Sequence, residues 1–85
     1  MAVRKVLDFK GIRDRKELHK YLKDVLELPD YYGNNLDALH DCMEEKKETF
    51  WIIIYHFEEL KKELGEYAEI LIQVFTDMGV RIELM

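Results

Sequence analysis

Five acidic side chains and no Lys or Arg lie between residues 30 and 45, which is the most uneven charge distribution in the chain. Two of them, Asp37 and Asp41, are four residues apart, and like charges at that spacing destabilise a helix by roughly 0.2–0.5 kcal/mol. The positive end of the helix dipole offsets this cost for an acid in the first turn, such as Asp37. It explains Asp41 and Glu44 less well. The pattern therefore leaves two interpretations open, a hydrated acidic face or a surface for a basic partner.

Two tyrosines and a glycine, Tyr31, Tyr32 and Gly33, come immediately before the predicted helix that carries Asp37 and Asp41. Exposed tyrosine is a favoured anchor in protein interfaces, because it offers both a ring and a hydroxyl. We expect the pair to divide, with Tyr32 packing in the core and Tyr31 facing outward. An outward tyrosine beside unpaired acids favours the protein-binding interpretation.

A nucleophilic enzyme site would need Cys42 as nucleophile and His40 as its base. The two residues are two apart on the predicted helix, so their side chains point in different directions. Cys42 also lies on the apolar side, where a cysteine behaves as a small hydrophobe and its thiolate is disfavoured. We therefore predict that the chain is not an enzyme.

A metal site could use His40, Asp41 and Glu44, since His40 and Glu44 are one helical turn apart. The sequence offers no second ligand pair to accompany them. His19 and His56 add no further constellation, and each is predicted to be a surface or a satisfied structural histidine. We expect neither a metal nor a cofactor.

Hydrophobic periodicity predicts the elements that hold this segment. Residues 2–9 alternate as a strand buried mainly on one face. From Asp14, the predicted N-cap, three- and four-residue steps predict a helix that Pro29 ends, because proline disfavours helical backbone in the residue before it. Asn34 or Asn35 then caps a second helix with an apolar side and an acidic side. The apolar side carries Leu36, Leu39, Cys42 and Met43, and the acidic side carries Asp37, Asp41, Glu44 and Glu45.

The second half of the chain repeats the pattern of a strand followed by two helices. Residues 49–55 form a continuous apolar, β-branched and aromatic run, which predicts a strand covered on both faces. Two segments with helical spacing follow, separated by Gly65 and closed by Gly79, and residues 80–85 alternate as a third strand. This order predicts an α/β fold with a small three-stranded parallel sheet.

Length and composition limit the class of protein. The 85 residues suffice for one hydrophobic core, so we expect a single domain over residues 1–85. Cys42 is the single cysteine, which rules out an internal disulfide and makes the cytoplasm the expected location. We find neither a secretion signal nor a membrane span, so we expect no membrane association.

The net charge of −5 argues against direct nucleic-acid binding and favours a basic protein partner. Residues 10–23 do carry six basic side chains against two acids. Their aromatic content is too low for base stacking, so a hydrated face or an intramolecular complement to acidic neighbours is the better interpretation.

The segment Leu28-Pro29-Asp30-Tyr31-Tyr32-Gly33-Asn34-Asn35-Leu36-Asp37-Ala38-Leu39-His40-Asp41-Cys42 closely resembles the signature segment of the barstar family of intracellular ribonuclease inhibitors. The resemblance extends weakly over the whole chain, through the strand at 50–55 and the run Gln73-Val74-Phe75. It implies a barstar-like fold, and it implies a protein inhibitor that inserts residues 31–45 into the active site of a small basic ribonuclease.

The same resemblance implies roles for individual residues. Asp41 would stand in for a substrate phosphate among catalytic basic groups, Tyr31 would pack against a catalytic histidine, and Asp37 would pair with another basic residue. Gly33 and Asn35 would contribute loop shape and backbone contacts. The target-facing residues on this reading are Tyr31, Gly33, Asn35, Asp37, His40, Asp41, Glu44 and Asp77.

The chain departs from the family pattern at two of these positions and at the end of the last helix. His40 stands where the family has tryptophan, and Asp77 is one methylene shorter than the glutamate it matches. Gly79 ends the last helix before a further acidic residue of the family. These departures keep an alternative open, a generic protein-interaction module whose partner is not a ribonuclease. The free chain is expected to be a monomer.

Overall fold

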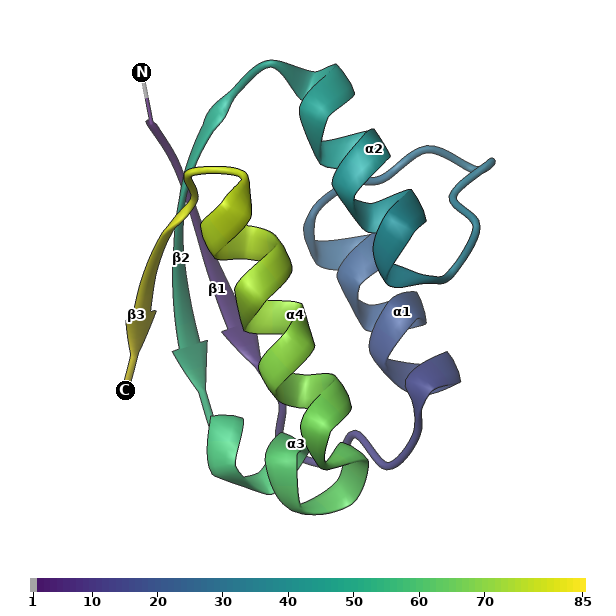
Figure 1. Ribbon diagram of the computed structural model, residues 1–85, viewed down its shortest axis with the longest axis vertical. Coiled ribbons are helices and arrows are strands. Elements are labelled where there is room, and N and C mark those ends of the chain that lie inside the picture. The colour runs from purple at the N-terminus through teal and green to yellow at the C-terminus, as the bar shows by residue number, and fades with distance from the viewer. Residues whose placement is uncertain (1) are drawn as a thin grey trace.

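The computed structural model describes residues 2–85, which form three strands and four helices (Figure 1). In chain order the elements are β1 (Ala2–Asp8), α1 (Arg15–Val25), α2 (Leu36–Lys46), β2 (Thr49–Tyr55), α3 (Phe57–Leu64), α4 (Glu66–Asp77) and β3 (Arg81–Leu84). The predicted order of a strand, two helices, a strand, two helices and a strand is confirmed.

The three strands form one parallel sheet in the order β1-β2-β3. In the register, Val6 pairs with Ile53 of the central strand, and Ile53 pairs with Glu83. Each return to the sheet passes through two helices, which provide the long crossover that a parallel connection requires. The predicted α/β class and parallel sheet are therefore confirmed.

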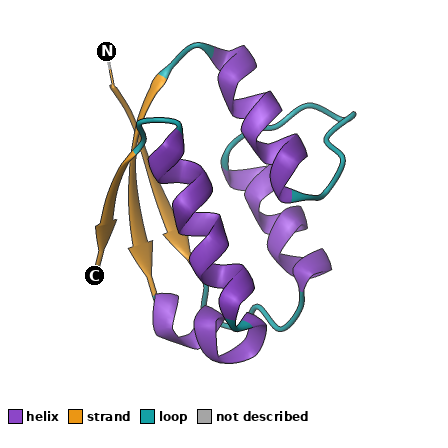
Figure 2. Cartoon of the chain, in the orientation of Figure 1, coloured by secondary structure: helices purple, strands orange, loops and turns teal. Residues whose placement is uncertain are grey.

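The hydrophobic core lies between one face of the sheet and the helices (Figure 2). Leu7, Ile52 and Ile54 project from β1 and β2 into it and are fully buried. Leu71 and Phe75 of α4 are also fully buried in the same core. The sheet and α4 thus form the base on which α1 and α2 pack.

No helix covers the other face of the sheet (Figure 2), so the prediction that residues 49–55 are covered on both faces is wrong, although Ile53 at the centre of that face is 5% exposed. Val6 and Tyr55 are 46% and 40% exposed. Trp51 is shielded by two guanidinium groups instead of a helix, with Arg4 and Arg81 at 5.4 and 4.8 Å from its ring centroid. Cation–π contacts and the aliphatic parts of the arginines explain why so apolar a strand tolerates this face.

Helix α1 begins as predicted, because the Asp14 side chain accepts a hydrogen bond from the Glu17 N–H at 2.8 Å. It ends at Val25, well before Pro29, so the prediction that proline ends it is wrong. Glu27 adopts left-handed backbone with φ 54°, and the Leu28 N–H reaches back to the Lys23 carbonyl at 2.9 Å. This closing turn satisfies the last free carbonyls of the helix. The helix has therefore ended before Pro29 restricts the backbone of the residue that precedes it.

A candidate acidic binding surface

Helix α2 separates an apolar face from an acidic one, as its spacing predicts. Leu39, Cys42 and Met43 are buried against the core. The acidic side chains of the helix are all exposed, and together with Asp77 of α4 they form what we call the acidic surface. Its members are Asp37, Asp41, Glu44, Glu45 and Asp77.

The loop before α2 contains the expected pair of tyrosines in opposite environments. Tyr32 is 5% exposed and belongs to the core, whereas Tyr31 is 71% exposed. The Tyr31 hydroxyl donates a hydrogen bond to Glu45 at 2.6 Å, and this bond raises the pKa of Tyr31. Sequence spacing gave no sign of this contact, because the two residues are fourteen positions apart.

The shape of the loop comes from two asparagines. Asn35 is the N-cap of α2, since its side chain accepts a hydrogen bond from the Ala38 N–H at 2.7 Å. Asn34 adopts left-handed backbone with φ 55°, a conformation that asparagine tolerates better than most residues. Gly33 is exposed, and a Cβ there would lie 3.4 Å from that of Ala38. The unusual backbone of this turn therefore lies at Asn34.

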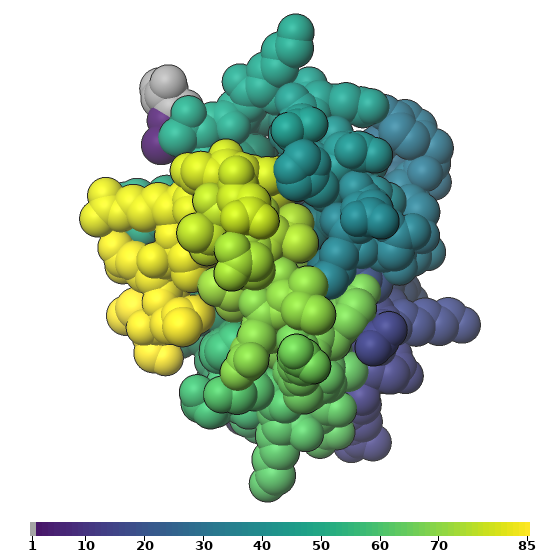
Figure 3. Space-filling model, in the orientation of Figure 1, coloured from purple at the N-terminus to yellow at the C-terminus, as the bar shows by residue number. Residues whose placement is uncertain are grey.

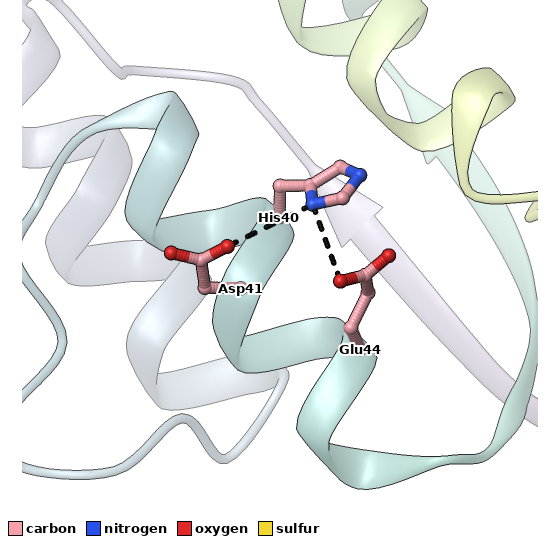
Figure 4. A group of neighbouring side chains, drawn as sticks. All are labelled: His40, Asp41 and Glu44. Carbon is pink, nitrogen blue, oxygen red and sulfur yellow. Dashed lines mark ion pairs between the residues drawn. The ribbon is translucent and has the colours of Figure 1, made fainter.

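No lysine or arginine within residues 2–85 forms an ion pair with the acidic surface. Asp41 and Glu44 instead lie on either side of His40, whose Nδ1 is 3.9 Å from the Asp41 carboxylate and 3.7 Å from that of Glu44 (Figure 4). Asp37 occupies the first turn of α2, where the helix dipole favours an anion. Most of the charge on this surface is thus left for solvent or a partner.

The ligand atoms of His40, Asp41 and Glu44 lie within 4.8 Å of one another. All three side chains come from one helix. The two carboxylates are exposed and the imidazole is half-buried. Both contacts of His40 lie at ion-pair distances, and exposed acidic groups commonly gather without an ion, so the arrangement needs no metal to explain it.

Asp77 is carried to the acidic surface by α4. The surface of α2 adjoins that of the C-terminal half of α4 (Figure 3). Asp77 and Glu44 line the same hollow of about 220 Å³. The Asp77 carboxylate accepts a hydrogen bond from Gln73 at 3.0 Å. The fold therefore places Asp77 close to α2, although 36 residues separate it from Asp41.

Two further features lie apart from the acidic surface. A hollow of about 810 Å³ is lined by residues of α1 and the turn after it, including Tyr21, Lys20 and Glu27, and by none of the predicted target-facing residues. Cys42 is buried, and burial raises the pKa of its thiol. A less acidic, enclosed thiol is a poor nucleophile.

The remaining two histidines have different surroundings. His56 is exposed, with Nδ1 2.7 Å from the Asp8 carboxylate. His19 is 1% exposed, and both of its ring nitrogens contact tyrosine hydroxyls, Nδ1 that of Tyr32 at 2.5 Å and Nε2 that of Tyr67 at 2.6 Å. Burial, and secondarily the nearby Arg15 charge, lower the pKa of His19. The prediction of a satisfied structural histidine is confirmed for His19, but its link to the loop was missed.

Comparisons with known proteins show which family this chain resembles. The family model described as "Barstar (barnase inhibitor)" matches residues 2–83. A Bacillus subtilis (strain 168) protein named "Putative ribonuclease inhibitor YrdF" is 36% identical in an alignment 78 residues long, which covers 85% of this chain and 80% of that protein. Across residues 2–85, no helix has both the length and the apolar character needed to cross a membrane.

Proposed function

The chain belongs to the barstar family, and from this premise we propose that it inhibits a small basic ribonuclease by inserting residues 31–45 into the active site. The family membership supports inhibition of a ribonuclease in general. The mode of insertion is our own inference from the acidic surface.

One observation carries the proposal, namely that the acidic surface has no lysine or arginine paired with it within residues 2–85. A ribonuclease active site must bind the phosphates of RNA, so it presents basic groups. Opposite fields accelerate the encounter of two proteins, and charge pairs buried at the centre of the complex slow their separation. The exposed carboxylates of α2 meet both requirements.

Within this surface, Asp41 takes the place of a substrate phosphate. It lies mid-helix, with its side chain 78% exposed and its weak contact to His40 as its one ion pair among the described residues. Tyr31 packs against a catalytic histidine, and Asp37 and Asp77 pair with basic residues around it. Gly33 and Asn35 contribute the loop backbone.

His40 and Glu44 give the surface its own specificity. A half-buried imidazole between two carboxylates replaces the large apolar ring that the family carries at this position. This change favours a cognate ribonuclease whose rim differs from that of barnase. It is also the observation that favours the alternative, a barstar-like module that binds another kind of protein.

The test is a titration of ribonuclease activity. The small basic ribonucleases secreted by the source organism are purified, and RNA hydrolysis is followed as the chain is added. We expect loss of activity at one-to-one stoichiometry for the wild type and retention of activity with Asp41→Ala. Asp24→Ala, an exposed acid on α1 with the same change in net charge, is the matched control and should inhibit like wild type.

The outcomes separate the two functions. Binding to a ribonuclease without loss of its activity would support the interaction module. Equal inhibition by Asp41→Ala and Asp24→Ala would refute the assignment of the acidic surface. Absence of any inhibition across the purified ribonucleases would refute the proposed function itself.

A further inference from the structure

The loop that presents Tyr31 has one deeply buried side chain. Between residues 30 and 35, Tyr32 is buried and the other five residues are exposed. The backbone of the loop contributes a hydrogen bond from the Tyr32 N–H to the Pro29 carbonyl at 3.0 Å. Whatever fixes the Tyr32 side chain therefore fixes the position of its exposed neighbour, Tyr31.

The Tyr32 hydroxyl is fixed by a buried polar network that joins three parts of the fold. His19 of α1 lies at its centre, with Tyr32 of the loop on one ring nitrogen and Tyr67 of α4 on the other. The imidazole lies at steep angles to both phenol rings, 55° and 83°. The Arg15 guanidinium covers the outer face of Tyr67 at 4.0 Å from its ring centroid.

With a neutral imidazole, which burial favours at His19, one arrangement of protons satisfies every contact in this network. The Tyr32 hydroxyl lies 3.5 Å from the Asn35 carbonyl and donates to it, so it must accept from His19 Nδ1–H. His19 Nε2 then has no proton and accepts from the Tyr67 hydroxyl. The chain of donors runs from α4, through His19 and Tyr32, to the residue that caps α2.

We propose that His19 and Tyr67 are positioning residues that hold the binding loop through Tyr32, and thereby set the affinity for a partner that neither of them touches. A loop already held in its bound shape loses less conformational entropy on binding. The consequence for affinity rests on the proposed function, whereas the anchoring of the loop does not.

The decisive variant is Tyr67→Phe, which removes one hydroxyl and keeps the ring beneath Arg15. Amide hydrogen exchange of the free chain measures two opening reactions, that of the loop at the Tyr32 amide and that of the whole fold at the β2 amides. If the network breaks whenever the loop opens, the variant must accelerate exchange at both sites by the same factor, on the order of tenfold.

The matched control is Ile54→Val, which lowers the stability of the core by a similar amount without touching the network. It should accelerate the β2 amides and leave the Tyr32 amide unchanged. The same pattern in Tyr67→Phe would show that the hydroxyl supports the fold but not the loop, and it would overturn the anchoring role. Unchanged exchange at both sites in Tyr67→Phe would overturn it as well.

A second measurement tests the consequence for binding, with the ribonuclease inhibited by the wild-type chain. Tyr67→Phe should weaken inhibition several-fold, Ile54→Val should leave it unchanged, and the loss due to Tyr67→Phe should shrink in a Tyr31→Ala background. Equal inhibition by Tyr67→Phe and wild type would overturn the effect on affinity. Because the exchange experiment needs no partner, it stands even if no ribonuclease is inhibited.

Discussion

The polar groups on the acidic surface of α2 and those in the network around His19 differ in burial and in hydrogen bonding. On the acidic surface, Asp37 and Asp41 are exposed and lack a lysine or arginine partner within residues 2–85. In the network, His19 is buried and both of its ring nitrogens are hydrogen-bonded. Water solvates an exposed carboxylate at little cost to the fold, whereas a buried polar atom without a partner costs about 1–3 kcal/mol. Unpaired charge is therefore tolerated only where water can reach it.

The difference also separates two kinds of histidine. His40 lies half-buried between two carboxylates on the surface, and His19 lies buried between two neutral hydroxyls. The first is placed to influence what the surface binds. The second is placed to influence how the loop is held. Mutations in the two regions should consequently change different measured quantities.

The largest expected effect is that of Asp41→Ala on binding. Removing one member of a charge pair buried in an interface costs about 2–5 kcal/mol, which is a loss of roughly thirtyfold to several thousandfold in affinity. The free energy of unfolding should change by less than about 0.5 kcal/mol, since the side chain is exposed. Inhibition titrations and urea unfolding of the same preparation measure both quantities.

Leu39→Ala should give the reverse result. Leu39 is fully buried on the opposite side of the same helix, and truncating such a side chain costs about 2–5 kcal/mol of stability. At temperatures where the variant remains folded, its affinity should stay near that of wild type. If Asp41→Ala and Leu39→Ala affected folding and binding to the same degree, the division of α2 into two faces would be refuted.

Raising the salt concentration should slow association with the ribonuclease. This effect should be smaller than those of the two substitutions and larger than that of pH. Attraction between exposed charges is screened beyond about 8 Å at physiological ionic strength, so steering by the acidic surface weakens as salt rises. We expect the association rate constant to fall by about tenfold between low salt and 0.5 M, with a smaller change in the dissociation rate constant. Stopped-flow mixing measures both, and an association rate indifferent to salt would argue against electrostatic steering.

Lowering the pH should have the smallest effect. It should reduce the stability that the network around His19 contributes to the fold. The folded-state pKa of His19 is lowered by burial and then by Arg15, so between that value and about 6.5 the unfolded chain binds more protons than the folded one. Stability contributed by neutral His19 is thus present above about pH 6.5 and is lost as the pH falls below it. Asp8, whose pKa is lowered by the Lys10 N–H and by His56, acts in a separate, more acidic window.

The measurement is urea unfolding at pH 7.5 and pH 5.0. Wild type should lose stability on acidification, and His19→Gln, which keeps a donor and an acceptor but cannot titrate here, should lose less. An equal loss in both proteins would show that His19 does not carry this dependence.

Local patterns predicted the elements well, and they failed where a distant contact decided the outcome. The spacing of Leu39, Cys42 and Met43 identified the buried face of α2, and the expected division between an inward Tyr32 and an outward Tyr31 is confirmed. Pro29 was the wrong signal for the end of α1, because the left-handed Glu27 had already closed the helix. The apolar run in β2 likewise did not reveal that Arg4 and Arg81 cover Trp51.

The sequence by itself determined the α/β order and the acidic face of α2, because both follow from patterns of neighbouring residues. The division between Tyr31 and Tyr32 was predicted as well, but the contact that holds the buried ring, between the Tyr32 hydroxyl and His19, is a tertiary one. Tertiary structure alone decided that Asp77 joins Glu44 at one hollow, that Glu45 binds the Tyr31 hydroxyl, and that His19 meets Tyr67. His19 and Tyr67 are 48 positions apart. Periodicity assigns a side chain to a face, but only the packing of one helix against another selects the partner it meets there.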